Sequence, residues 1–207
     1  MHPNPAFRKV EDARNIAFAR DRAFGMLTVN AADGPLISHV PFALNESGTI
    51  ADLHLVRSNP ILRMLDAPMP ALIAVAGPDA YVSPDWYDTP DQVPTWNYVA
   101  VHLRGTLEKL PQDAMRDMLD MQSAVYEKRL TPKTPWTADK MTPEVLDKMM
   151  RQIVPYRLTV ASINGTWKLG QNKPDAVRVA AADAMHSSDI GSEVAALADL
   201  MRDPPQD

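Results

Sequence analysis

Short apolar segments joined by tight turns dominate the first half of this chain and constrain its fold more than any other feature. Residues 24–30, 35–45 and 48–56 are rich in β-branched and other apolar side chains. The segments between them, AADG and NESG, carry the Gly, Asp and Asn residues that tight turns favour. Little room is left for the helical crossovers that parallel strands need. The pattern predicts an antiparallel meander within a small β-barrel that carries peripheral helices.

Three further segments have the character of strands. Residues 69–77 form an apolar run that predicts a buried strand, ended by a turn at Gly77–Pro78 and extended by 81–83. Residues 97–110 alternate between two sets of side chains, which is typical of a half-buried strand. Residues 156–172 return to strand character. The predicted fold class is therefore mainly β.

Helical periodicity and capping residues mark the remaining elements. A leading helix is expected within 9–23, a helix that packs on the sheet within 111–130, and a closing helix within 189–203. Asn59 and Thr142 can each cap a short helix, because a proline follows both at the first helical position.

Composition favours one folded domain. The chain has 207 residues, 45% of them hydrophobic, which is enough to bury a substantial core in a single domain over 1–207. It has no run of eighteen apolar residues, and its first residues, MHPNPAFRKVEDAR, turn polar at once. We therefore expect a cytoplasmic protein with no membrane segment.

Residue content argues against several kinds of chemistry. The absence of cysteine removes disulfides, thiolate nucleophiles and cysteine-based metal sites. The histidines show no ligand spacing, so no metal site is predicted. A net charge of −5, no dense Lys/Arg run and no recognisable helix-turn-helix argue against direct DNA binding. P-loop, Rossmann, zinc-protease and hydrolase signatures are also missing.

An aromatic-rich segment follows the fourth predicted strand. Residues 81–105 hold Tyr81, Trp86, Tyr87, Trp96 and Tyr98, in a chain that is only 6% aromatic. A proline-rich loop is normally polar and exposed, so large rings there are expected to cover a core edge, a neighbouring subunit or a flat ligand. The residues alone leave these three alternatives open.

Three other short motifs have both a ligand-binding and a structural interpretation. His39 lies beside Pro41, which removes a ladder hydrogen bond, and it is either a ligand contact or an ordinary barrel histidine. RSNP at 57–60 is either a helix cap or an anion site, because an arginine and helix-start N–H groups both favour phosphate. KLGQNK at 168–173 is either a turn at Gly170 or a contact for phosphate and heteroatom-rich edges.

Five motifs occur in order along the chain: HVPFAL, LHLVRSNP, YVSPDWY, VPTWNYVAVHLRG and KLGQNK. In this order and at these distances they resemble the PaiB-like proteins, described as FMN-binding negative transcriptional regulators. The resemblance extends from HPNPAF to the last predicted helix. It implies an antiparallel split β-barrel of the flavin-reductase and pyridoxamine-oxidase type, which binds FMN without a Rossmann glycine motif. It also implies a homodimer with FMN at the subunit interface.

The same resemblance implies which residues hold FMN. Ser38, His39 and Val40 would lie on a strand beside the flavin ring, and Arg57, Ser58 and Asn59 would bind the phosphate. Thr95, Trp96 and Asn97 would come from the partner subunit. Lys168, Gln171 and Asn172 would complete the rim of the site. The aromatic segment would then cover the flavin or the neighbouring subunit.

Three functions are compatible with this resemblance. The first is a flavin-linked regulator or sensor. The second is an FMN-dependent oxidoreductase acting on a small molecule, in which the flavin supplies the redox chemistry and His39, Tyr98 or His102 exchanges protons. The third is haem binding or degradation, with His186 as a candidate ligand. No catalytic residue is assigned from the sequence.

Overall fold

The chain forms two compact units. The computed structural model describes residues 1–205. Unit 1 contains Met1–Phe18, Val75–His102 and the residues from Ile163 onward, and unit 2 contains Ala19–Ala74 and Leu103–Ser162. Both units are discontinuous in sequence, because the chain passes through each of them more than once. A single functional domain over 1–207 stays a prediction.

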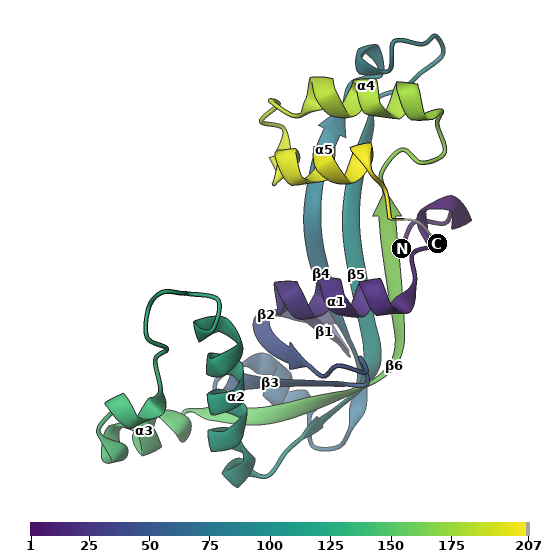
Figure 1. Cartoon of the computed structure of the whole chain (residues 1–207). Helices are drawn as coiled ribbons and strands as arrows, with labels where there is room; N and C mark the ends of the chain where they lie inside the picture. The colour runs from purple at the N-terminus through teal and green to yellow at the C-terminus, as the bar shows by residue number, and fades with distance from the viewer. Residues whose placement is uncertain (206–207) are drawn as a thin grey trace. The chain divides into compact units, whose positions relative to one another are not determined.

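The strands form one sheet. They are β1 (Phe24–Ala31), β2 (Gly34–Leu44), β3 (Ile50–Val56), β4 (Met69–Val82), β5 (Thr95–Lys109), β6 (Ile153–Lys168) and β7 (Gly191–Ser192). Their order is β1-β2-β3-β6-β5-β4-β7, and β1 also pairs with β4. Because β1 has antiparallel partners on both sides, β2 and β4, the sheet closes into a barrel (Figure 1). This is the mainly antiparallel barrel that the sequence predicts.

Buried and more exposed side chains alternate along β1 and β2, and the buried ones form the core of the barrel. Leu27 and Val29 of β1 and Val40 and Phe42 of β2 are almost completely buried. His39 is exposed, although the next residue, Val40, is buried. Successive side chains of a strand point to opposite faces, so His39 lies on the outer face of the barrel while Val40 faces the core.

β4 differs from its prediction. It runs unbroken from Met69 to Val82, so the turn predicted at Gly77–Pro78 is wrong. A Cβ at Gly77 would lie 2.6 Å from Cζ of Phe18 and 2.9 Å from Cβ of Val99. Glycine at this position therefore permits a close approach of neighbouring elements rather than a turn.

The helices follow the predicted positions, with one addition. Four of them, α1 (Asp12–Arg22), α2 (Met115–Glu127), α3 (Pro143–Met150) and α5 (Val194–Arg202), lie within the predicted segments. α4 (Asp175–Met185) has no counterpart in the sequence prediction; its buried residues are Arg178, Ala181, Ala182 and Met185. The 3-10 helices are η1 (Pro5–Phe7), η2 (Pro60–Met64), η3 (Pro84–Tyr87), η4 (Gln112–Ala114) and η5 (Ala138–Lys140). Within residues 1–205, no helix is long and apolar enough to cross a membrane.

In unit 1, α4 and α5 lie side by side and complete an apolar core (Figure 1). The core includes Tyr87, Trp167 and Met201, which are all almost fully buried. Arg178 of α4 is buried too; its Nε donates to the Met201 carbonyl oxygen at 2.7 Å, and its Nη1 lies 2.6 Å from Asp175 Oδ1. These bonds connect α4 to the end of α5.

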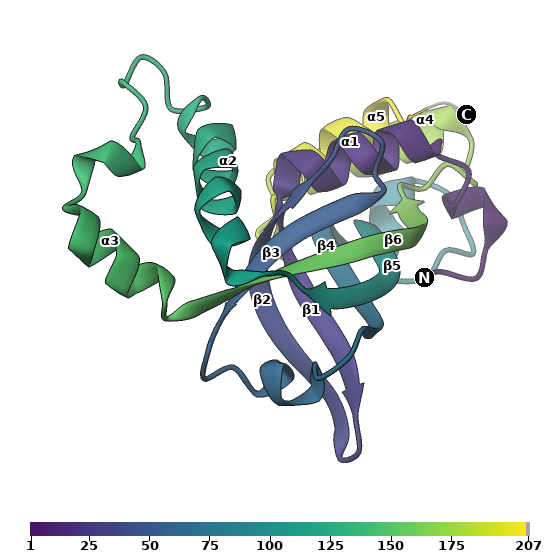
Figure 2. The same cartoon turned by 90° about the horizontal axis from the view of Figure 1, so that it is seen from below.

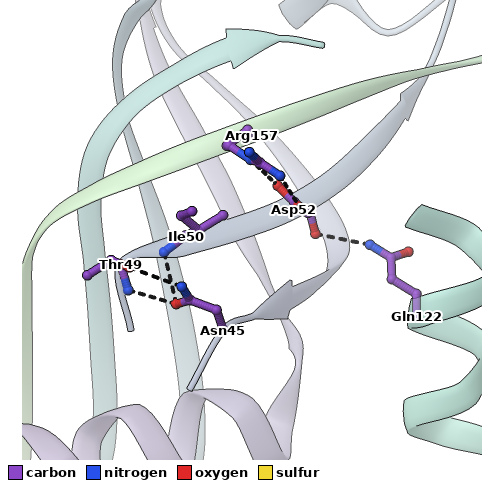
Figure 3. Close-up of polar contacts among 6 residues, drawn as sticks. All are labelled: Asn45, Thr49, Ile50, Asp52, Gln122 and Arg157. Atoms are coloured by element: carbon purple, nitrogen blue, oxygen red, sulfur yellow. Dashed lines mark hydrogen bonds and ion pairs between the residues drawn. The ribbon is translucent and has the colours of Figure 1, made fainter. Parts of the chain in front are cut away.

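In unit 2, a polar network joins β3, β6 and α2. Arg157 forms a bidentate ion pair with Asp52, with N–O distances of 2.7 and 2.8 Å. Nε2 of the buried Gln122 on α2 donates to the Asp52 carbonyl oxygen at 3.0 Å (Figure 3). Oδ1 of Asn45 accepts from the Thr49 N–H at 2.8 Å and closes the β2–β3 turn. After α2 the chain passes through a long connector into α3, and both helices belong to this unit (Figure 2).

His54 of β3 makes the stability of unit 2 depend on pH. Burial lowers the pKa of His54, and the contact with Gln122 opposes this shift. The unfolded chain takes up a proton near pH 6.5, whereas folded His54 stays neutral until a lower pH. The contribution of neutral His54 to the free energy of unfolding is therefore fully present above pH 6.5. It decreases as the pH falls from 6.5 to the pKa of His54 in the folded protein, and it does not decrease further below that pKa.

We expect urea unfolding to show this loss between pH 7.5 and 5.5 in the wild type and a smaller loss in His54→Gln. His186→Gln, which removes an exposed histidine from α4's C-terminal end, is the matched control and should keep the wild-type difference. An equal pH dependence in wild type and His54→Gln would contradict this assignment.

Candidate functional site

The β2 residues of the predicted site lie on both faces of the strand. Ser38 is half-buried, His39 is exposed and Val40 is buried. The Phe24 ring stacks against His39, with centroids 6.3 Å apart and 27° between the planes. The outer face of the barrel thus presents two stacked rings, while the Val40 side chain belongs to the core. The backbone of Val40 pairs with Gly25 of β1.

Asn59 connects the end of β3 to β2. Its Oδ1 accepts from the Ile61 N–H at 3.0 Å, which confirms the predicted cap on η2, and Pro60 occupies the first helical position. Its Nδ2 donates to Ser38 Oγ at 2.9 Å. The structure therefore brings two of the predicted residues into direct contact.

Arg57 is exposed but already takes part in the structure of unit 2. Its Nε donates to the Arg151 carbonyl oxygen, and its Nη2 donates to Gln112 Oε1 at 2.9 Å. These bonds link the residue that follows β3 to η4 and to the residue that follows α3. Ser58 is exposed beside it. Arg57 is thus an anchor within unit 2, and an anion would have to share its guanidinium with these contacts.

The β5 residues Thr95, Trp96 and Asn97 belong to unit 1 and differ in burial. Asn97 is 1% exposed, and its Nδ2 lies 3.3 Å from Sδ of Met201, which is a weak acceptor. Trp96 is 47% exposed and meets the Tyr81 ring edge to face at 6.4 Å. A large indole surface therefore stays open on β5.

Lys168, the last residue of β6, is held against the start of β5. Its Nζ donates to Thr95 Oγ1 and, at 2.7 Å, to the Trp96 carbonyl oxygen. Burial lowers the pKa of Lys168, and the positive charge of Lys173 lowers it further. Two ammonium groups are thus close enough to disfavour each other's charge.

The turn after β6 is braced by Gln171. Its Nε2 donates to the Trp167 carbonyl oxygen at 2.6 Å, and its Oε1 accepts from the Leu169 N–H at 2.9 Å. Gly170 has φ of 79°, a left-handed conformation that glycine adopts without strain. The predicted turn is present, and the Gln171 side chain stabilises it.

Four predicted residues line a single cavity of about 240 Å³ in unit 1: Thr95, Asn97, Lys168 and Asn172. We call this cavity the lysine pocket. Its wall also includes Tyr87, Asp91, Gln92 and Lys173, which the sequence analysis did not assign to a site. The Lys173 ammonium bonds to Gln92 Oε1 and lies 4.2 Å from the centre of the Tyr87 ring. The pocket therefore combines two cations with amide and hydroxyl groups.

Tyr87 and Lys173 could have been suspected only because they belong to the motifs YVSPDWY and KLGQNK. They are far apart in sequence, and local periodicity carries no information about their contact. The packing of η3 next to the turn after β6 brings them together. The sequence analysis missed them for this reason.

The aromatic segment divides among three elements, as the predicted strands at 81–83 and 97–110 imply for Tyr81 and Tyr98. Tyr81 belongs to β4, Trp86 and Tyr87 to η3, and Trp96 and Tyr98 to β5. Tyr87 is 1% exposed and contributes to the core. The core alternative thus holds for Tyr87, whereas Trp96 keeps an open face for a ligand or subunit.

The predicted residues form two groups. Ser38, His39, Val40 and the 57–59 segment belong to unit 2, and the other six belong to unit 1. Among the described residues, no three His, Asp or Glu side chains are grouped so as to hold a metal ion.

Several solved structures have the same fold. A FAD and heme binding protein from Mycobacterium smegmatis aligns with a TM-score of 0.57 at 16% identity, covering 78% of this chain and 73% of its own. The flavocytochrome Anf3 from Azotobacter vinelandii aligns with a TM-score of 0.54 at 11% identity, covering 81% and 72%. At these identities the likeness establishes the fold, and it places the chain in the class of split-barrel proteins.

Sequence comparison assigns the family. A curated relative, "Protease synthase and sporulation protein PAI 2" of Bacillus subtilis (strain 168), is 31% identical over 172 residues, which are 82% of each chain. The model of the family described as "Putative FMN-binding domain" matches residues 1–162. The chain belongs to this FMN-binding family. The predicted resemblance to PaiB-like proteins, the split-barrel fold and FMN as the cofactor are thereby confirmed.

Proposed function

We propose that this protein is a flavin-linked regulator or sensor of the PaiB-like type, whose state depends on FMN. The observation that carries the proposal is the match of an FMN-binding family to residues 1–162 of a closed split barrel. The relation to the B. subtilis sporulation protein supports the regulatory part. The net charge of −5 favours action through a partner or a small molecule over direct DNA contact.

The two groups of predicted residues are consistent with a cofactor shared between subunits of a cytoplasmic homodimer. In this proposal His39, Asn59 and their neighbours belong to one subunit, and Trp96 with its neighbours comes from the partner. The half-exposed Trp96 ring suits the flat isoalloxazine, and the lysine pocket suits a negatively charged group. Bound FMN would supply electron or hydride chemistry.

The alternative is an FMN-dependent oxidoreductase, and the exposed His39 on the outer face of the barrel favours it. An imidazole that is open to solvent can exchange protons with a bound substrate or reduced cofactor. Haem binding is a further alternative, because two proteins of the same fold carry haem or a cytochrome in their names.

One spectroscopic experiment separates these functions. Purified protein is mixed with FMN, desalted, and then treated with NADH or NADPH without oxygen. Retained flavin bands that persist support a sensor, and bands that bleach at a catalytic rate support the oxidoreductase. An intense Soret band after haem addition would support haem binding. Loss of all flavin on desalting, with no binding by calorimetry, would refute the proposed function.

Trp96→Ala is expected to weaken FMN binding by about tenfold or more, because it removes the open ring against which the flavin would stack. Stability should change by about 1 kcal/mol or less, since half of the side chain is exposed. Fluorescence titration with FMN and urea unfolding measure the two effects. Val145→Ala, on α3 at a site that is 49% exposed, is the control and should bind FMN normally. Unchanged FMN affinity together with a large loss of stability would identify Trp96 as a core residue.

A further inference from the structure

We infer that the lysine pocket is an anion-binding subsite that takes the phosphate or carboxylate group of a small molecule. The anionic group could belong to FMN or to a separate small molecule, and the inference rests on the proposed function only if it is the phosphate of FMN. Lys168, Asn172 and Lys173 lie beyond residue 162, where the match to the FMN-binding family ends. A free anionic metabolite is the other source.

The first argument is charge. Lys168 and Lys173 line the same cavity, and Asp91 is the one carboxylate among the lining residues described for it. The close approach of two cations is unfavourable in the half-buried surroundings of Lys168. An anion between them would offset this repulsion, and charge-assisted hydrogen bonds to its oxygens would add to the binding energy.

The second argument is an unsatisfied donor. The Tyr87 hydroxyl is buried and has no hydrogen-bond partner anywhere in the described part of the chain. Tyr87 is 1% exposed and lines the pocket. A buried hydroxyl normally finds a partner, because its desolvation is otherwise uncompensated. An oxyanion in the pocket would accept this hydrogen bond.

The third argument is preorganisation. Lys168 is fixed by its bonds to Thr95 and the Trp96 carbonyl, and an ammonium group has three N–H donors. Lys173 is placed by its bond to Gln92 and by the Tyr87 ring under its charge. The Gly170 turn, braced by Gln171, holds Lys173 at this position. Little side-chain entropy therefore remains to be lost when an anion binds.

The test uses inorganic phosphate and the full chain without flavin. Thermal unfolding is followed against phosphate concentration, with chloride replacing phosphate at constant ionic strength. Phosphate should raise the melting temperature of the wild type, because a ligand that binds only the folded state stabilises it. Lys173→Gln and Tyr87→Phe should each weaken the apparent phosphate affinity about tenfold. Lys109→Gln, which removes an exposed lysine at the end of β5, should leave it unchanged.

Tyr87→Phe gives the sharpest result, because it separates folding from binding. Without phosphate, its melting temperature should equal or exceed that of the wild type, since the lost hydroxyl has no partner in residues 1–205. With phosphate, the stabilisation should largely disappear. Equal effects of phosphate and chloride on the wild type, or wild-type phosphate affinity in both variants, would overturn the inference.

Flavin titrations identify the source of the anion. If the pocket takes the phosphate of FMN, Lys173→Gln weakens FMN binding more than riboflavin binding, and phosphate competes with FMN. If it takes a separate anion, both flavins bind Lys173→Gln like the wild type, and phosphate still binds beside FMN. Either result supports the subsite. Because the phosphate arm contains no flavin, a protein that binds phosphate but no FMN would refute the proposed function and leave the subsite standing.

Discussion

Gly105→Ala is expected to destabilise the barrel by about 3 kcal/mol or more. A Cβ at Gly105 on β5 would lie 1.9 Å from the Thr159 carbonyl oxygen and 3.0 Å from Cα of Val160 on β6. Both contacts are with backbone, so no side-chain rotation relieves them. The β6 strand would have to move away from β5, and such overpacking usually exceeds the cost of a surface substitution several-fold.

Equilibrium urea unfolding measures this loss, and the adjacent strand position provides the control. Thr106→Ala changes an exposed residue of the same strand and should lower the free energy of unfolding by about 1 kcal/mol or less. If Gly105→Ala and Thr106→Ala unfold at the same urea concentration, β5 and β6 do not approach each other this closely. Loss of FMN binding should accompany the unfolding of Gly105→Ala, because the proposed site depends on the barrel.

Asn15→Leu is expected to destabilise unit 1 by about 3 kcal/mol. Asn15 is 2% exposed; its Oδ1 accepts from the Trp167 indole N–H at 2.9 Å, and its Nδ2 donates to the Val10 carbonyl oxygen at 3.2 Å. Leucine has a similar size but leaves both groups without this partner, and each buried unpaired group costs about 1–3 kcal/mol. Trp167 precedes Lys168, so phosphate binding in the lysine pocket should weaken as well.

A double-mutant cycle tests whether the hydrogen bond itself carries this effect. Trp167→Phe removes the indole donor, and Asn15→Leu combined with Trp167→Phe should be more stable than the sum of the two single losses predicts. Strict additivity in urea unfolding would show that the Asn15–Trp167 bond contributes little. Gly165→Ala is an independent check, because its Cβ would lie 2.0 Å from Asn15 Oδ1.

The local structure around the candidate site was predicted from the sequence, whereas its long-range contacts were not. Asn59 was correctly assigned as a cap, and the turn at Gly170 was correctly predicted, because caps and turns depend on residues a few positions away. The phosphate contact of Arg57 stays a prediction, whereas its bonds to Arg151 and Gln112, which are distant in sequence, were not predicted. No local rule predicts such partners.

Sequence by itself determined most of the strands, most of the helices and the antiparallel class, because side-chain periodicity, turn residues and capping act over short distances. Its motifs also indicated the family, through their resemblance to known proteins. Tertiary structure alone decided that Gly77 lies within a continuous β4, and that Tyr87 is buried while Trp96 stays open. It also decided that Tyr87 and Lys173 share a pocket. These outcomes depend on which distant segments pack together, and a glycine, an aromatic ring or a lysine has the same local preferences whichever partner it meets.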